Sequence, residues 1–184
     1  THRKNIYSIN SNLSFEKIIK VINESRFTRI PLWENNPEHW KVTDTEVPFS
    51  MQGILQLIEQ QQHIRSTGML RLMICLNEND EAVGAIDLYD ADFRHSRAAV
   101  GILIGESQHR NKGYASEALD LIVVYARKLL SLENLYASVQ ADNHESLSLF
   151  NKCGFTEVGR RKNWFFHKKE RIDEVMFQLC LNED

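Results

Sequence analysis

The sequence predicts an α/β protein with a mixed sheet and helices on both of its faces. The continuous apolar run from Val100 to Ile104 is typical of a strand that is buried on both sides. A glycine-containing turn follows, and apolar residues at helical spacing then extend from Tyr114 to Leu130. Short strand-like segments separated by polar turns lie before and after this pair. Together these observations favour one sheet with helical cover.

The first thirty residues predict a short strand, from Ile6 to Ile9, and then a helix. Ser14 is a candidate N-cap, although Lys17 stands where a capping box would carry an acidic residue. Four apolar residues then fall on one helical face, namely Phe15, Ile18, Ile19 and Ile22. Because the sequence contains neither an internal repeat nor a low-complexity linker, we expect one domain over residues 1–184.

A second amphipathic helix is predicted from Ser50 to His63, because Ile54, Leu55 and Ile58 recur on one face. The centre of the chain then predicts antiparallel strands joined by polar turns at 77–80 and 92–96. These strands are Arg71–Leu76, Ala82–Tyr89 and Ala98–Ile104.

The last third of the chain again mixes strands and a helix. Asn143 is a candidate N-cap of a short helix, and Gly154 suits the left-handed residue that ends such a helix. Phe155 would then pack back on that helix. The strands predicted here are Leu135–Val139, Phe155–Val158, Trp164–His167 and Asp173–Cys180.

Composition excludes several classes of function. The formal net charge of −3 over 184 residues argues against nucleic acid as the main partner, since no basic excess is available to neutralise phosphates. One basic cluster is read as a solvated hairpin: Arg160, Arg161, Lys162, Lys168 and Lys169. The three cysteines are widely spaced and predict neither a disulfide framework nor a zinc site. We therefore expect no metal. Because no apolar stretch of membrane length and no signal-type N-terminus is present, we also expect a cytoplasmic protein.

The stretch from Arg110 to Ala115 predicts a phosphate site. It lies between a strand and the start of a helix, where backbone N–H groups have no helical partner and the helix dipole is positive. Gly113 lets the backbone approach an anion closely, and Arg110 and Lys112 add cationic donors. A nucleotide P-loop is excluded, because its lysine follows the last glycine and precedes Ser or Thr, whereas Lys112 precedes Gly113.

A second segment, from Asn143 to Phe155, raises the specificity of this pattern. Together the two segments resemble the GNAT superfamily of acyl-CoA-dependent N-acyltransferases, in the branch of ribosomal-protein N-terminal acetyltransferases and spermidine N-acetyltransferase. The resemblance runs from about Trp33 to Leu181 and leaves residues 1–30 as an atypical N-terminal segment. It implies a GNAT-type, mostly antiparallel sheet that is splayed between two central parallel strands. It also implies an enzyme that moves an acetyl group from acetyl-CoA to a primary amine by direct attack.

The resemblance assigns roles to individual residues. The backbone of Ile102 to Ile104 would pair with pantetheine, and the Ile102 N–H is the expected donor to the thioester oxygen. The expected coenzyme A contacts are Ile102, Leu103, Ile104, Arg110, Asn111, Lys112, Gly113, Tyr114, Ala115, Asn143, Phe150 and Lys152. For Ile102 to Ile104 an ordinary core strand would have the same side chains. Asn143 also suits a simple helix cap.

Two departures from the family bear on catalysis. Phe150 stands where many relatives have the tyrosine that protonates the leaving thiolate; Ser146 or a water molecule is the candidate substitute. A general acid contributes about 10²–10⁴-fold, so its loss is substantial but not fatal. Ala99 stands near the position of a glutamate base. Deprotonation at pH 7 costs a lysine-like amine about 4.6 kcal/mol and an α-amine about 1.4 kcal/mol, which favours an α-amine slightly.

The acceptor is the least defined part. Trp33, Glu34 and Asp87 are candidate acceptor-binding residues, with core packing or a surface carboxylate as the plain alternatives. The expected acceptor is a small-molecule amine or a protein N-terminus, with nucleic acid and membrane excluded and a homodimer as the expected assembly. Four histidines in loop-like or edge contexts are predicted to be surface residues: His95, His109, His144 and His167. A non-catalytic CoA-binding module for regulation or assembly, and an enzyme using another nucleotide, stay open.

Overall fold

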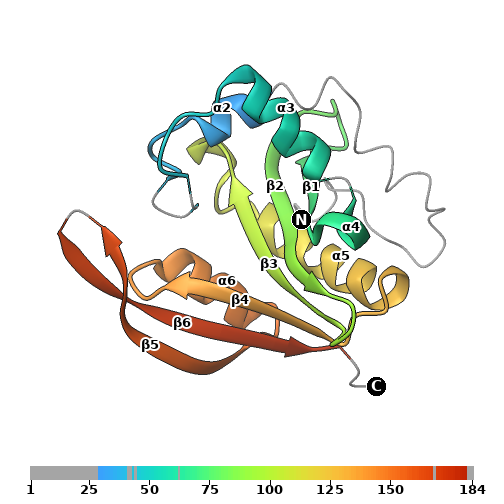
Figure 1. The fold of residues 1–184 in the computed structure, drawn as a ribbon, viewed down its shortest axis with the longest axis vertical. Helices are drawn as coiled ribbons and strands as arrows, with labels where there is room; N and C mark the ends of the chain where they lie inside the picture. Colours follow the sequence, from blue (N-terminus) through green and yellow to red (C-terminus); the bar gives the residue numbers. More distant parts are fainter. Residues whose placement is uncertain (1–28, 41–42, 44, 62, 168, 182–184) are drawn as a thin grey trace.

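The computed structural model describes residues 29–40, 43, 45–61, 63–167 and 169–181. Its strands form one six-stranded sheet in the order β1-β2-β3-β4-β6-β5 (Figure 1). The strands are β1 Leu70–Cys75, β2 Ala82–Asp92, β3 Arg97–Ile104, β4 Asn134–Gln140, β5 Thr156–His167 and β6 Glu170–Cys180. The helices are α2 Ile30–Glu34, α3 Met51–Gln60, α4 Ile64–Thr67, α5 Tyr114–Leu129 and α6 His144–Lys152, with a 3-10 turn at Ser107–His109.

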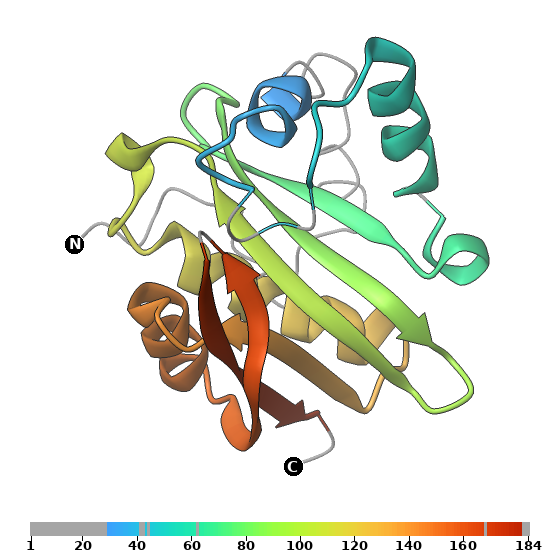
Figure 2. The same cartoon turned by 60° about the vertical axis from the view of Figure 1, so that its left-hand side comes forward.

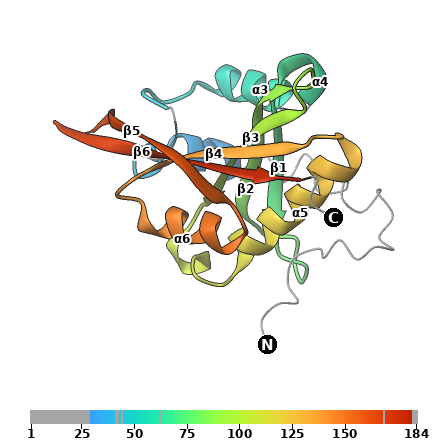
Figure 3. The ribbon, with the colours of Figure 1, turned by 90° about the horizontal axis from the view of Figure 1, so that it is seen from below.

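Helices cover both faces of the sheet, as predicted. On one face, α2 and α3 bury Ile30, Trp33 and Ile54 against β1 and β2. On the other face, α5 and α6 contribute to the larger core, which includes Leu119 and Phe150. Figure 2 shows the strands of the β1–β3 half crossing in front of α5, and Figure 3 shows α3 on the opposite side of the sheet from α5 and α6.

Among the strands that the structure describes, β3 and β4 are the one parallel pair, and the sheet divides between them. Within the described strands, these two pair at three positions, Arg97 with Asn134, Ala98 with Leu135 and Ala99 with Tyr136. Beyond that point β3 continues to Ile104 and β4 to Gln140, and Figure 1 shows the two strands diverging. The splayed parallel pair expected from the family resemblance is therefore present.

The β5 region differs from the prediction. In place of two short strands, β5 runs without interruption from Thr156 to His167 and follows β6 as the edge strand. Its register against β6 shifts between Glu157 and Gly159 and again between Arg161 and Phe165. The first shift adds one residue to β5 and turns the side chains that follow to the other face, and the second adds two residues. The apolar pattern is therefore broken although the backbone ladder continues.

The N-terminal predictions, the strand at 6–9 and the helix begun by Ser14, lie outside the described residues. Among the helices that the structure describes, none combines the length and apolar character needed to cross a lipid bilayer. The helix predicted from Ser50 begins as expected, because the Ser50 hydroxyl accepts a hydrogen bond from the Gly53 N–H at 3.1 Å. It ends at Gln60, three residues before the predicted end.

Candidate functional site

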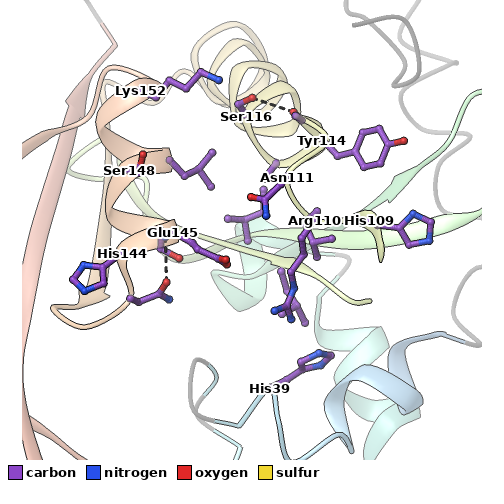
Figure 4. A pocket seen from close by; sticks show the side chains of 18 of the residues that line it. His39, His109, Arg110, Asn111, Tyr114, Ser116, His144, Glu145, Ser148 and Lys152 are labelled. Atoms are coloured by element: carbon purple, nitrogen blue, oxygen red, sulfur yellow. Dashed lines mark hydrogen bonds between the residues drawn. The ribbon is translucent and has the colours of Figure 1, made fainter. Parts of the chain in front are cut away.

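A pocket of about 670 Å³ opens where β3 ends, between the start of α5 and the inner side of α6. Figure 4 shows Glu145, Ser148 and Lys152 along α6, with Arg110 and Asn111 reaching in from the loop before α5. His39 approaches from the side of α2. The other lining residues are Glu38, Ile102, Leu103, Ile104, His109, Gly113, Tyr114, Ala115, Ser116, Asp142, Asn143, His144, Ser146 and Leu149.

The loop before α5 presents backbone to this pocket, in addition to the side chains of Arg110 and Asn111. Gly113 is the N-cap of α5 and adopts φ +89°, and Asn111 also has a positive φ of 59°. A Cβ atom placed on Gly113 would meet no heavy atom within 4 Å. The first-turn N–H groups of a helix have no helical acceptor, so this 16-residue helix directs its positive end at open space.

Cationic side chains surround this helix end. Arg110 lines the pocket from the loop, and Lys152 lines it from the last turn of α6. Lys112 is exposed next to Gly113 but is not among the residues that form the wall. Two cations and the end of a helix dipole favour an anionic ligand at this position.

The divergence of β3 from β4 leaves backbone groups of β3 facing a gap. The Gly105 N–H donates to the Val83 carbonyl of β2 at 2.9 Å, which fixes the alternation along β3. Successive residues of a strand direct their N–H groups to opposite sides, so those of Ile102 and Ile104 face away from β2 and toward the gap. Since β4 has diverged, these N–H groups can serve a bound molecule.

Helix α6 forms the facing wall. Asn143 caps it, with its side-chain oxygen accepting from the Ser146 N–H at 3.1 Å, as the sequence predicts. Glu145, Ser148 and Lys152 recur at spacings of three and four residues and therefore share one face of the helix. The N-terminus of this helix also borders the pocket, because Asp142 and Asn143 line it.

His39 ties this pocket to α2. Its ring is buried, with 3% exposed, and its Nδ1 and Nε2 atoms each lie 3.0 Å from a carbonyl oxygen, those of Trp33 and Gly105 respectively. The Trp33 indole covers Gly105 so closely that a Cβ there would stand 2.2 Å from the indole nitrogen. Gly105 is thus required for close approach, and α2 is held against the start of the loop.

Two of the predicted acceptor residues, Glu34 and Asp87, lie apart from this pocket in an ionic cluster with Arg71. Arg71 donates to both carboxylate oxygens of Asp87 at 2.7 Å and also contacts Glu34. Burial opposes the charge on Arg71, but attraction to Asp87 and Glu34 outweighs it and raises the pKa of Arg71 above its ordinary value. Glu34 is 7% exposed, so the alternative of a surface carboxylate is wrong for it. Trp33 is likewise a core residue, with its Nε1 3.4 Å from Glu106.

The structure gathers most of the predicted cofactor residues around this pocket, together with Ser146, the predicted catalytic hydroxyl. They are Ile102, Leu103, Ile104, Arg110, Asn111, Gly113, Tyr114 and Ala115 on one wall, and Asn143 and Lys152 on the facing wall. Phe150 lies elsewhere. It is 3% exposed and packs edge-on to Phe155 and stacked on Phe177, with ring centroids 5.1 and 5.9 Å apart. We expected Phe150 to contact the cofactor, but its side chain is packed into the core and does not line this pocket.

Sequence reasoning missed several lining residues. His109 was predicted to be at the surface, and this is wrong: it is 7% exposed, 3.6 Å from Glu81 and 3.9 Å from Glu106. For Glu145 and Ser148, the spacing along α6 was a usable signal. For His39 there was none, because its partner Gly105 is 66 residues away. Among the described residues, no group of three His, Cys, Asp or Glu side chains could hold a metal ion.

Comparisons with known proteins agree with this geometry. The family model described as an acetyltransferase (GNAT) domain matches residues 19–156. The uncharacterized N-acetyltransferase p20 of Bacillus licheniformis is 32% identical over 113 residues, which cover 61% of this chain and 63% of that protein. The chain thus spans about six tenths of the length of this curated relative.

Solved structures share the fold. Spermidine N-acetyltransferase from Vibrio cholerae, crystallised with CoA and spermine, has a TM-score of 0.76 at 22% identity, covering 88% of this chain and 93% of that chain. A dodecameric structure of spermidine N-acetyltransferase from the same organism has a TM-score of 0.71, also at 22% identity, with coverage of 87% and 91%.

Proposed function

This chain belongs to the GNAT acetyltransferase family, and on that premise we propose that it transfers the acetyl group of acetyl-CoA to a primary amine. The observation that carries the proposal is the exposed N-terminus of α5, capped by Gly113, beside the gap between β3 and β4. One end of this arrangement suits a diphosphate and the other offers unpaired backbone N–H groups. An acyl donor that combines a diphosphate with a thioester fits both ends.

The residues present fit coenzyme A. First-turn N–H groups at Tyr114 and Ala115, the flexible backbone at Gly113 and the side chain of Arg110 would hold the pyrophosphate. Space at the Gly113 Cβ position supports this assignment, because a backbone–phosphate contact needs that space. Asn143, Ser146 and the face of α6 would border the pantetheine arm, and Lys152 adds a cation.

The reaction would proceed by direct attack without a covalent acyl-enzyme. Acetyl-CoA supplies an activated acyl group, and the protein has to position it and stabilise the oxyanion. The Ile102 N–H faces the gap and is the donor that we assign to this task. Ser146, in the first turn of α6, is the side-chain hydroxyl that we assign to the departing thiolate.

Calorimetry with coenzyme A tests the cofactor half of the proposal. We expect the wild-type protein to bind at micromolar strength and Gly113→Asp to lose binding, because its carboxylate would occupy the anion position. Lys128→Gln, near the far end of α5, changes the net charge by the same one unit and is the charge-matched control, which should bind normally. Equal affinity in wild type and Gly113→Asp would contradict the assignment.

A non-catalytic CoA-binding module is the second candidate. It is favoured by the core position of Phe150, which leaves no tyrosine hydroxyl at that place. A thiol-release assay with acetyl-CoA and a panel of amines separates the two functions. The panel should include spermidine and spermine, α-amino acids and short peptides with free N-termini. Turnover on any acceptor rejects the binding-only function.

We also propose that the acceptor is a small amine or a protein N-terminus, and that the chain assembles as a homo-oligomer. Support for a small amine comes from similarity to polyamine acetyltransferases, and support for assembly from the dodecameric neighbour. Sedimentation equilibrium of the purified protein tests the assembly, and a monomer at tens of micromolar would reject it.

A further inference from the structure

A buried carboxylate that is hydrogen-bonded to a serine lies on the face away from α5 and α6 and has no part in the chemistry above. Glu174 of β6 is 4% exposed and accepts a hydrogen bond from the Ser138 hydroxyl of β4. Its other oxygen lies 2.8 Å from Nη1 of Arg161. A buried charge is costly unless it is paired, so the buried carboxylate of Glu174 beneath the exposed Ser138 needs an explanation.

Sheet register places Ser138 at the edge of the gap between β3 and β4. The last described pair joins Ala99 to Tyr136, and two residues further along each strand bring Gly101 level with Ser138. Ser138 therefore lies on the β4 side of the gap as far past the last pair as Gly101 does on the β3 side, and Gly101 is one residue before Ile102, the proposed oxyanion donor.

The face on which Ser138 lies follows from alternation along β4. Leu135, Ala137 and Val139 enter the large core beneath α5 and α6, so Ser138 must point to the opposite face. Glu174 follows the same rule, because its neighbour Val175 is in that core. A ligand in the pocket of α5 and α6 leaves this opposite face as the approach to the acyl carbon.

On the β3 side of the gap, the nearby carboxylate already has its partner. There, Asp87 stands opposite Gly101, but both of its oxygens are held by Arg71, whose side chain is 15% exposed. Glu174 differs, because its guanidinium partner, Arg161, hydrogen-bonds only one of its oxygens and is 48% exposed, with its guanidinium also lying over the Trp164 ring. Gly101 has no side chain of its own, and the Tyr89 ring lies beside it, with Cε1 3.4 Å from the place that a Cβ atom would take.

We propose that Ser138 accepts a hydrogen bond from an N–H of the acceptor amine, and that Glu174 positions the Ser138 hydroxyl for this task. A serine hydroxyl is both donor and acceptor. Because its proton is committed to Glu174, the Ser138 oxygen offers its lone pairs to the gap and selects a ligand that donates. An attacking amine has N–H groups to donate while its own lone pair faces the acyl carbon. The inference rests on the proposed acetyl transfer.

Steady-state kinetics with the fastest amine of the panel test this role. Ser138→Ala should lower kcat/KM for the amine about 5- to 10-fold, as expected for one lost hydrogen bond. Affinity for coenzyme A and the slow hydrolysis of acetyl-CoA should not change, whereas a merely structural role would alter all three. Ser138→Thr keeps the hydroxyl and should retain activity within about 2-fold.

Glu174→Gln tests the positioning residue, and Asp173→Asn is its matched control. Asp173 is the adjacent carboxylate, and its partners are Lys162 and the Asn163 N–H rather than Ser138. We expect Glu174→Gln to lower amine kcat/KM as Ser138→Ala does and Asp173→Asn to leave it unchanged. If Glu174→Gln fails to fold, the exposed Ser138 variants still decide the matter.

The possible failures are distinguishable. A wild-type protein that binds coenzyme A but acetylates no amine would overturn the proposed function, and this inference with it. A wild-type protein that turns over, with Ser138→Ala equally active on the amine, would overturn the inference alone. An equal loss of amine transfer and coenzyme A binding in Ser138→Ala would also overturn it.

Discussion

Phe150 stands where the family resemblance leads us to expect a tyrosine. Its ring is packed between Phe155 and Phe177, yet its neighbour Leu149 lines the pocket. We expect Phe150→Tyr to raise kcat at least about 10-fold, if the missing acid limits thiolate departure. Stopped-flow measurement of thiol release gives the rate, and calorimetry should show unchanged coenzyme A affinity.

The control for this variant is Phe155→Tyr, which adds a hydroxyl to the same aromatic cluster beyond the end of α6. A buried hydroxyl without a partner costs about 1–3 kcal/mol of folding free energy, so this variant should lose stability and gain no rate. If Phe150→Tyr behaves in the same way as Phe155→Tyr, another group protonates the thiolate.

The three cysteines are predicted to differ in reactivity. Burial, and then the negative charge of Asp120, raise the pKa of Cys153, so less of its reactive thiolate is present at neutral pH. Cys180 is exposed and Cys75 is buried. Iodoacetamide should therefore modify Cys180 first, and Cys153 only as the pH rises toward its raised pKa. Peptide mass spectrometry at pH 7 and 9 checks this order, and faster modification of Cys153 at pH 7 would contradict it.

Single residues divide into those that local pattern predicts and those that it does not. Asn143 and Gly154 were predictable because their tasks, a helix cap and a left-handed φ of 86°, depend on immediate neighbours. Glu34 and Asp87 were candidate acceptor residues, with a surface carboxylate as the alternative. Their actual partner, Arg71, is 37 and 16 residues away, and no local rule indicates such a pairing.

At the scale of elements, periodicity was sufficient wherever one face is buried throughout. Helix α5 spans Tyr114–Leu129 against a prediction of Tyr114 to Leu130, because its apolar stripe is continuous. In β5 the two register shifts interrupt the alternation, so the sequence indicates two strands where the backbone forms one. The position of the pocket also follows from elements, because a strand, a glycine cap and a helix are consecutive in sequence.

The β5–β6 hairpin should respond to acid near its tip. The Lys162 ammonium, at 2.7 Å, and then the Asn163 N–H, at 2.9 Å, lower the pKa of Asp173 below its ordinary value. Because the folded pKa is the lower one, this contribution to stability is complete above the unfolded pKa of about 4 and disappears as pH falls through the folded value.

Proton NMR of the Asn163 amide tests this behaviour. Its chemical shift should be constant above pH 5 and move as the pH falls below about 4. In Asp173→Asn this pH-dependent change of the Asn163 chemical shift should be absent. A shift that titrates equally in both proteins would assign the change to another group.

At the scale of the whole molecule, the sheet is two halves with a narrow junction. The β1–β3 half and the β4–β6–β5 half share the three parallel pairs of β3 and β4, and the core beneath α5 and α6 spans both. The pocket lies across this junction, with Ile102 to Ile104 on one side and α6 on the other. A ligand that fills it contacts both halves at once, and binding should stabilise the folded chain as a unit.

Coenzyme A should therefore raise the thermal midpoint of unfolding. At a concentration of about 100 times Kd, binding adds about 2.7 kcal/mol, which corresponds to about 5–11 °C for a chain of this size. Scanning calorimetry with and without coenzyme A measures the shift, and ATP at the same concentration shows whether phosphates alone suffice. Gly113→Asp should melt at the same temperature with and without coenzyme A. A shift as large in that variant as in the wild type would place the ligand away from the N-terminus of α5, because a carboxylate at that helix end and a bound diphosphate repel each other.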